Sequence, residues 1–363
     1  DNLEVTASFR RDDYSDVGEA DSFKIGALWT PVAGTTVKLN FGEGFRAPTM
    51  DTLYGATTFS ANSATDYAAC EASGTPADDC SSKQVSTLIT SNENIGPEES
   101  ESFTMSIEQD FGVLMDALEG LTVRFDYFDI TVNNAIVGIG TQSVLWNDYI
   151  GGSELTNNVT FYDADGIGGD GSASGAPVGT GTTSGSTALG GVTCPAGATY
   201  VKREGSNSDV YIIRSCANGR VDYIGASSTN VGEINVVGHD LFVNYMRDVG
   251  PGVMNIALDY TSMDEYNSDA FTGSTKQVNS IGFPGTPETR NNLSLSYSWD
   301  RYSVALTRRH IGDYRLNSVP EIVGGSATGG IVASGGTQDE YDALDLQINA
   351  DLGKYGTVTY GIF

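Results

Sequence analysis

The stretch TTVKLNFGEGFRAPT, residues 35–49, begins with alternating apolar and polar residues, and this alternation stops before Pro48. Its apolar Val37, Leu39 and Phe41 alternate with polar residues, and successive side chains of a β-strand point to opposite faces. Such alternation predicts a strand with one apolar and one polar face. A long polar segment follows, and alternation returns only after NIGPEES, residues 94–100. The sequence therefore predicts two strands joined by a long connection.

The same period of two residues recurs along the chain. About eleven alternating runs occur, near residues 3–9, 23–29, 37–41, 103–107, 121–127, 237–245, 254–260, 292–297, 304–306, 344–352 and 358–362. Short connections are expected near 12–21, 31–34, 112–120, 250–252, 299–301 and 353–356. Long connections are expected near 47–100, 137–225, 263–287 and 313–339.

Short turns at one end of the strands and long loops at the other are typical of an antiparallel transmembrane β-barrel. A soluble sandwich rarely places four long loops at one end. We therefore expect an all-β fold in which residues 1–363 form one partial barrel domain with extracellular loops. A large sandwich or a β-helix also alternates, although no fixed repeat period supports the β-helix.

The composition agrees with a β-rich protein. Glycine accounts for 45 of the 363 residues and tyrosine for 18, whereas only 10 are proline. No run approaches the roughly 18 apolar residues of a spanning helix, but a barrel strand needs only about 9–11 residues with every second one free to be polar. The net charge of −28 argues against nucleic acid as a partner, because few basic groups are available to neutralise phosphates.

The two faces of the strands predict two environments. We expect the apolar side chains to face lipid and polar ones, such as Asp345, Gln347 and Asn349, to face a water-filled interior. Aromatic side chains near the strand ends suit the membrane–water interface. These residues are Trp29, Tyr127, Tyr245, Tyr297 and Trp299.

The four cysteines form two local pairs, Cys70 with Cys80 and Cys194 with Cys216. Their spacing does not match a zinc knuckle, and the chain has only two histidines. Two disulfides, each within one loop, are therefore expected and indicate an oxidising compartment. Other pairings remain open at this stage.

The motifs GFRAP (44–48) with Leu53-Tyr54, and NIGPE (94–98) leading to Phe103, resemble those of TonB-dependent outer-membrane receptors. The resemblance implies a barrel of about 22 strands around an N-terminal plug, of which this chain would supply about eleven C-terminal strands without the plug. The apolar phase of the last run passes through Ile362 and not Phe363, so one further strand is expected after it. Further elements in the family's order are GHDL at 238–241, Pro287 with RNNL at 290–293, and RRHIG at 308–312.

Several polar and aromatic residues are candidates for ligand binding. Arg46 in GFRAP either contacts a ligand or the plug, or pairs with a carboxylate of the interior such as Glu43. Aromatic side chains in the loops either stack on a sugar or a siderophore, or pack the loops against each other. These are Tyr54, Phe59, Tyr67, Trp146, Tyr149 and Tyr162.

The acidic segment 163–170 resembles the start of a calcium loop, with Asp163, Asp165 and Asp170 as candidate ligands. Ser174 stands where an EF-hand requires glutamate, so an acidic surface loop is the alternative. No other cofactor is indicated. His239 is expected at the rim, and His310 lies beside Arg308 and Arg309 without an evident nucleophile.

The resemblance implies a receptor of the bacterial outer membrane, not an enzyme, since motifs such as G-x-S-x-G and H-E-x-x-H are absent. Loops 47–100 and 137–225 would capture a scarce, bulky ligand: a siderophore, a cobalamin-like compound or an oligosaccharide. The implied partners are outer-membrane lipid, the transported ligand and the TonB complex. The alternatives are a passive porin-like barrel and a secreted acidic β-protein that binds polysaccharide.

Overall fold

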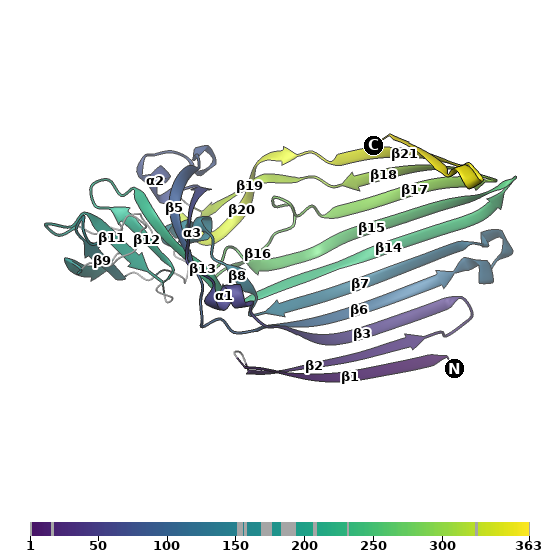
Figure 1. The fold of residues 1–363 in the computed structure, drawn as a ribbon, viewed down its shortest axis with the longest axis horizontal. Helices are drawn as coiled ribbons and strands as arrows, with labels where there is room; N and C mark the ends of the chain where they lie inside the picture. Colours follow the sequence, from purple (N-terminus) through teal and green to yellow (C-terminus); the bar gives the residue numbers. More distant parts are fainter. Residues whose placement is uncertain are drawn as a thin grey trace.

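The computed structural model describes residues 2–15, 18–150, 155, 158–167, 176–182, 194–205, 209–230, 232–323 and 326–362. A wide, curved sheet of long strands occupies one part of the molecule, and a smaller body of short strands and helices covers one end of it (Figure 1). Among these residues no helix has the length and apolar character needed to cross a membrane.

The wide sheet, here called the main sheet, is antiparallel throughout. Eleven strands follow one another along it in chain order, which confirms the predicted number, and the short β16 (Gln277–Asn279) pairs with β15. The eleven strands are β1 (Leu3–Tyr14), β2 (Gly18–Trp29), β3 (Thr35–Arg46), β6 (Glu98–Asp110), β7 (Leu121–Asn133), β14 (Glu233–Val249), β15 (Gly252–Asp269), β17 (Thr289–Trp299), β18 (Tyr302–Ile311), β21 (Tyr341–Asp351) and β22 (Thr357–Ile362).

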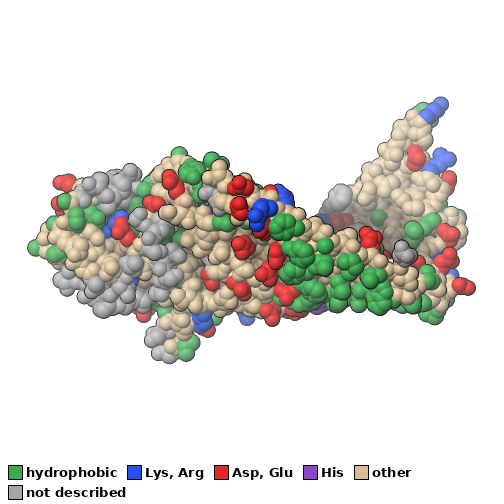
Figure 2. All heavy atoms as spheres, turned by 90° about the horizontal axis from the view of Figure 1, so that it is seen from below, with side chains coloured by type: hydrophobic (Ala, Val, Ile, Leu, Met, Phe, Trp, Pro, Cys, Tyr) green, Lys and Arg blue, Asp and Glu red, His purple; other side chains and the backbone are tan. Residues whose placement is uncertain are grey.

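The strand register places apolar side chains in continuous rows across one face of the main sheet. Tyr245 pairs with Ile256, Ile256 with Leu295, and Leu295 with Leu306, which in turn pairs with Leu346. These side chains are not covered by protein: Leu295, for example, is 44% exposed. Figure 2 shows hydrophobic side chains gathered over the sheet, bordered by acidic ones toward the smaller body. An exposed apolar surface of this extent indicates an apolar environment outside the protein.

The opposite face of the main sheet is polar. The hydroxyls of Ser294 and Thr307 lie 2.6 Å apart across β17 and β18. Arg309 on β18 pairs with Asp345 on β21 at 2.9 Å. Cross-strand pairs of this kind satisfy polar groups at a surface that water can reach. The two faces therefore have the apolar and polar character predicted from the sequence.

The first hairpin corrects the sequence-based prediction of a polar turn over residues 12–21. Pairing between β1 and β2 continues to Tyr14 and Gly18, so most of the expected turn is strand. Asp21 accepts two hydrogen bonds of 2.7 Å from its cross-strand neighbour Arg11. Opposite charges on facing strands stabilise this polar hairpin. The number of charged residues in the sequence does not by itself reveal such pairs.

Gly238 illustrates why one motif of β14 requires glycine. The strand register shifts between Val237 and Gly238, which marks a β-bulge. A Cβ at Gly238 would lie 2.5 Å from the Ser262 carbonyl oxygen and 2.6 Å from the ring of Phe128. A larger residue would therefore push the neighbouring strands apart.

The four long connections contain regular structure that the sequence analysis did not predict. An eight-stranded sheet consists of β4 (Thr58–Ala64), β5 (Lys83–Thr90), β8 (Ile136–Gly138), β9 (Asn158–Tyr162), β10 (Gly179–Thr182), β11 (Tyr200–Glu204), β12 (Tyr211–Ser215) and β13 (Val221–Asn230). The last long connection is the hairpin of β19 (Tyr314–Val323) and β20 (Ser326–Gln338). Helical segments are α1 (Met50–Tyr54), α2 (Tyr67–Ala72), α3 (Thr141–Ile150) and the 3₁₀ turns η1 (Ala77–Asp79), η2 (Phe111–Val113), η3 (Asp116–Leu118) and η4 (Gly353–Tyr355), of which η2–η4 lie in short turns. We call the second sheet, with α2, α3, η1, the 270–287 segment and the β19–β20 hairpin, the loop body.

Candidate functional site

The loop body has a core of its own. Val144 and Leu145 of α3 are almost fully buried, as are Val210, directly before β12, and Ile212 and Ile224 of the second sheet. Burying a side chain of this size stabilises the folded state by about 1.5–3 kcal/mol. The loops therefore fold by the same principle as a soluble domain.

A parallel strand pair links two of the connections that the sequence analysis treated as separate loops. β13 pairs with β5 from Tyr223 opposite Ser86 to Ser227 opposite Thr90. Behind this pair the buried hydroxyls of Thr87 and Thr141 lie 2.9 Å apart. Segments 47–100 and 137–225 consequently form one unit.

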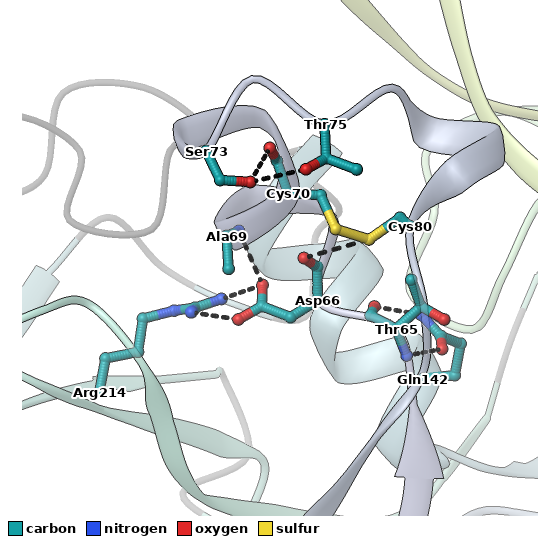
Figure 3. Close-up of a disulfide and its surroundings, with 9 residues drawn as sticks. All are labelled: Thr65, Asp66, Ala69, Cys70, Ser73, Thr75, Cys80, Gln142 and Arg214. Atoms are coloured by element: carbon teal, nitrogen blue, oxygen red, sulfur yellow. Dashed lines mark hydrogen bonds and ion pairs between the residues drawn. A yellow bond between two sulfur atoms is a disulfide. The ribbon is translucent and has the colours of Figure 1, made fainter.

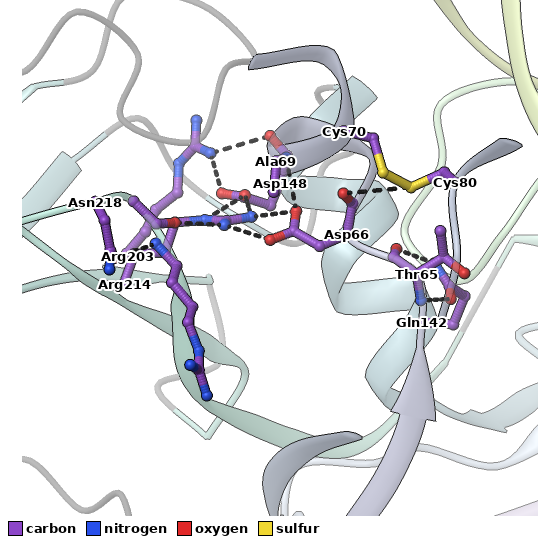
Figure 4. Close-up of polar contacts among 12 residues, drawn as sticks. Thr65, Asp66, Ala69, Cys70, Cys80, Gln142, Asp148, Arg203, Arg214 and Asn218 are labelled. Atoms are coloured by element: carbon purple, nitrogen blue, oxygen red, sulfur yellow. Dashed lines mark hydrogen bonds and ion pairs between the residues drawn. A yellow bond between two sulfur atoms is a disulfide. The ribbon is translucent and has the colours of Figure 1, made fainter. Parts of the chain in front are cut away.

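A buried cluster of four charges fastens the second sheet to the helices (Figure 4). The Arg214 guanidinium, 2% exposed, lies 2.6 Å from Asp148 and 2.8 Å from Asp66. Arg203 donates to the other Asp148 oxygen at 2.7 Å. Burial alone would lower the pKa of Arg214, but the charges and hydrogen bonds of the two aspartates outweigh it and hold that pKa above its ordinary value. The cluster is balanced in charge, so removing one member would leave an uncompensated buried charge.

Asp66 connects this cluster to the first disulfide (Figure 3). Its carboxylate accepts a hydrogen bond from the Ala69 amide at 3.2 Å and so caps α2. The Cys70–Cys80 disulfide closes the segment that follows, and Cys194–Cys216 closes a second one beside β12. Both expected pairings are thus present. By restricting the unfolded chain, a disulfide that closes a loop of this size stabilises the folded state by about 3 kcal/mol.

An apolar cluster joins the β19–β20 hairpin and the 270–287 segment to the helices. It consists of Tyr67, Ala68, Tyr149, Ile150, Ala270, Phe271 and Ile331. Tyr67 and Tyr149 are only 8% and 6% exposed, and burial, followed by the charges of Asp78 and Glu71 respectively, raises the pKa of each phenol. Of the two interpretations given for these tyrosines, the structure places them in loop packing.

The remaining candidate aromatic residues differ in accessibility. Tyr54 at the end of α1 and Phe59 on β4 are 53% and 54% exposed, so part of each side chain is available to a ligand. Tyr162 packs against the buried cluster of Ile167, Tyr211 and Ile213. Trp146 stacks obliquely on Phe271 with 5.7 Å between ring centroids, yet also lines an open cleft.

Arg46 pairs with Glu98 and not with the suggested Glu43. Its Nε lies 2.6 Å from Oε1 of Glu98, and the two residues face each other across β3 and β6. Glu43 is three positions from Arg46 and therefore points to the other face of the strand, opposite Glu101. Glu98 also accepts a hydrogen bond from the Ile136 amide at 3.1 Å. The arginine of GFRAP and the glutamate of NIGPE thus hold together the base of the loop body.

The calcium prediction is only partly within the described residues. Asp163 and Asp165 are exposed in the turn after β9, where the Asp165 amide donates to the Asp163 carboxylate at 3.2 Å. Asp170 lies outside the described residues. Within the described part of the chain no group of three or more His, Cys, Asp or Glu side chains is arranged to hold a metal. The calcium site stays a prediction.

Both histidines lie on the strand phase that carries the apolar rows. His239 is 3.2 Å from Asp264, with its ring 5.7 Å from that of Phe125. His310 and Arg308 both contact Asp342, at 3.1 and 2.7 Å. These contacts are polar pairs between neighbouring strands of the main sheet, and they do not form the arrangement of a nucleophile with its base.

Two clefts open on the part of the loop body that the structure describes. The first, of about 450 Å³, lies between α3, the α2–η1 segment and the β19–β20 hairpin, and we call it the hairpin cleft. The second, of about 370 Å³, lies on the other side of the Cys70–Cys80 disulfide and is called the disulfide cleft. Both volumes fall in the range of small-molecule sites. Sequence reasoning missed both, because their walls come from segments far apart in the chain.

Comparisons with known proteins agree with this architecture. A family model described as "TonB dependent receptor-like, beta-barrel" matches residues 1–363. The siderophore receptor PirA from Acinetobacter baumannii aligns over 99% of this chain and 39% of its own, with a TM-score of 0.55 and 14% identity. A mutant of the ferric enterobactin receptor PfeA from Pseudomonas aeruginosa aligns over 99% of this chain and 36% of its own, with a TM-score of 0.55 and 16% identity.

A comparison with curated proteins gives no match. At these identities the structural similarities establish a shared fold, and the chain spans well under half the length of either receptor. The family match over all 363 residues carries the assignment. The chain belongs to the TonB-dependent receptor family and forms part of its β-barrel.

Proposed function

We propose that this chain is part of a bacterial outer-membrane receptor, which captures a scarce ligand in its loop body and takes it up with energy supplied through TonB. The family consists of transport receptors, and the PirA and PfeA structures are described as those of a siderophore receptor and a ferric enterobactin receptor. The apolar face of the main sheet contacts lipid, and its polar face lines the route of the ligand.

The construction of the loop body is the observation that carries this proposal. The first two long connections share a core and a buried ion cluster, and an apolar cluster joins the other two connections to them. Two disulfides close segments within this body. A site that is already ordered loses little conformational freedom when a ligand binds. A passive pore has no need of an ordered body with clefts at the end of its wall.

Energy coupling in this proposal belongs to parts of the receptor outside residues 1–363. The chain itself provides wall and capture surface. The contact between Arg46 and Glu98 lies where the loop body meets the main sheet, so it connects the capture surface to the wall.

Uptake of labelled probes by cells that express the complete receptor tests the proposal. Ferric enterobactin, cyanocobalamin and a series of neutral oligosaccharides are offered to cells with and without TonB. We expect at least one probe to accumulate only when TonB is present. Equal accumulation in both strains would instead indicate a passive barrel, and a receptor that stays dispersed without detergent would contradict the membrane assignment.

A further inference from the structure

The two clefts of the loop body differ in charge. The disulfide cleft is lined by both signs, with Lys83 and Arg220 facing Asp66 and Asp79. The hairpin cleft has a single charged residue, Asp78, among the described residues that line it. Arg315 reaches the carbonyl oxygen of Gly335 at the rim, at 3.4 Å, but is not part of that lining.

The hairpin cleft has an aromatic wall. Trp146 forms part of it, and its ring packs against the ring of Phe271. The indole Nε1–H of Trp146 is covered and has no hydrogen-bond partner in the described part of the chain. A buried donor without a partner costs free energy, so packing and not a hydrogen bond sets the position of this indole.

Polar groups that are free to bind lie opposite this wall. In the part of the chain that the structure describes, no hydrogen bond involves the side chains of Ser82, Asn317 or Ser318, all of which line the cleft. Gln142, by contrast, is fully engaged with the backbone of Thr65, at 2.8 and 3.0 Å. Hydroxyl and amide groups both donate and accept, so they pair well with the hydroxyls of a ligand.

The charge in the hairpin cleft disfavours an anionic ligand. Asp78 accepts a hydrogen bond from Ser334 of β20 and keeps further acceptor positions available. A carboxylate repels an anion at close range but forms strong hydrogen bonds with hydroxyl donors. Without a lining cation to compensate, the cleft suits a neutral ligand.

We propose that the hairpin cleft binds a neutral, hydroxyl-rich ligand of the oligosaccharide class, with Trp146 as the stacking surface and Asn317, Ser318 and Asp78 as hydrogen-bonding groups. A sugar ring has an apolar C–H face that packs on an indole and an edge of hydroxyls that requires polar partners. The inference rests on the proposed function, in which this ligand is the transported one.

Calorimetric titration of the complete receptor in detergent tests this inference. The probes are neutral trisaccharides of glucose, xylose and N-acetylglucosamine, with ferric enterobactin as the anionic contrast. We expect at least one trisaccharide to bind. The exposed rim substitution Asn317→Ala should weaken it about three- to tenfold, and Trp146→Ala at least about tenfold. Lys83→Gln in the disulfide cleft is the matched control and should leave the affinity within about twofold.

The inference is overturned if none of the trisaccharides binds, or if a bound trisaccharide is unaffected by Asn317→Ala. Because Trp146→Ala removes a packed side chain, its circular dichroism is compared with that of the parent, and Asn317→Ala decides the question if that variant is misfolded.

Uptake distinguishes failure of this inference from failure of the proposed function. TonB-dependent uptake of ferric enterobactin without trisaccharide binding contradicts the inference and leaves the receptor function intact. Trisaccharide binding with uptake that does not require TonB supports the inference and contradicts active transport.

Discussion

The main sheet and the loop body differ in where they place their apolar side chains. In the described residues, the fully buried apolar side chains all lie in the connections, mostly in the loop body, and the strands of the main sheet contribute none. The main sheet instead leaves side chains such as Leu293, Leu295 and Leu306 about two-fifths exposed. One region buries its apolar surface in protein and the other presents it outward, so the two regions depend on different surroundings for their stability.

The largest expected effect breaks the loop body alone. Arg214→Ala leaves the buried Asp148 and the partly buried Asp66 without their main cation, which should destabilise the loop body by about 3–5 kcal/mol. Hydrogen exchange of the α3 amides in the detergent-solubilised receptor measures this loss. Arg11→Ala, at an exposed pair of the main sheet, is the control and should change little. Equal acceleration of exchange in the β17 amides would contradict the independence of the two regions.

The next effect breaks the main sheet alone. Leu295→Arg places a charge in the middle of an apolar row and should destabilise the inserted sheet by about 2–4 kcal/mol. Urea titration of the receptor in lipid vesicles measures the change. Ser296→Arg, one residue away on the polar face, is the matched control. The account of the faces is wrong if both substitutions are equally harmful.

A somewhat smaller effect concerns the covalent links. Replacing Cys70 and Cys80 with serine releases the segment between α2 and η1, and should lower the stability of the loop body by about 2–3 kcal/mol. The fluorescence of Trp146, in a receptor whose other tryptophans are replaced with phenylalanine, follows the thermal unfolding of the loop body and gives the shift. The unfolding of the main sheet should be unchanged, and a parallel shift there would show that the disulfide braces both regions.

The smallest effect is a pH dependence of the loop body. Burial raises the pKa of Tyr67 and Tyr149, so both phenols keep their protons in the folded state at a pH where they lose them in the unfolded chain. Their contribution is fully present below about pH 10, the ordinary tyrosine pKa, and is lost as the pH rises through the raised values. We expect Tyr67→Phe to reduce the loss of stability above that pH in a denaturant titration. An unchanged pH profile in this variant would contradict the burial of Tyr67.

The sequence predicted the main sheet well, because alternation over long runs is a direct consequence of a two-faced strand. It located the strands, their apolar phase and the segments that connect them. The β1–β2 turn was placed too wide, since acidic residues such as Asp12 and Asp21 lie in strands and pair with arginine. A run of charged residues looks like a turn in the sequence when the partners of those residues are unknown.

The loop body was beyond the same reasoning. Its strands are short, and β13 pairs with β5 in parallel although the two are far apart in the chain. The four-charge cluster around Arg214 depends on that tertiary arrangement. So does the ion pair of Arg46, which forms with Glu98 and not with Glu43. The suggestion of Glu43 was also inconsistent with alternation, because residues three positions apart in a strand point to opposite faces.

Site-directed spin labelling along β17 and β12 tests the contrast most directly. Single labels are placed at positions 292–298 and 210–214 of the receptor in lipid vesicles, and their collisions with oxygen and with a water-soluble nickel complex are measured. We predict oxygen access at positions 293, 295 and 297, nickel access at 294 and 296, and little access to either reagent at 212 and 213. If positions 293 and 295 are shielded from both reagents, as 212 and 213 are, the apolar face is covered by protein and the account is wrong.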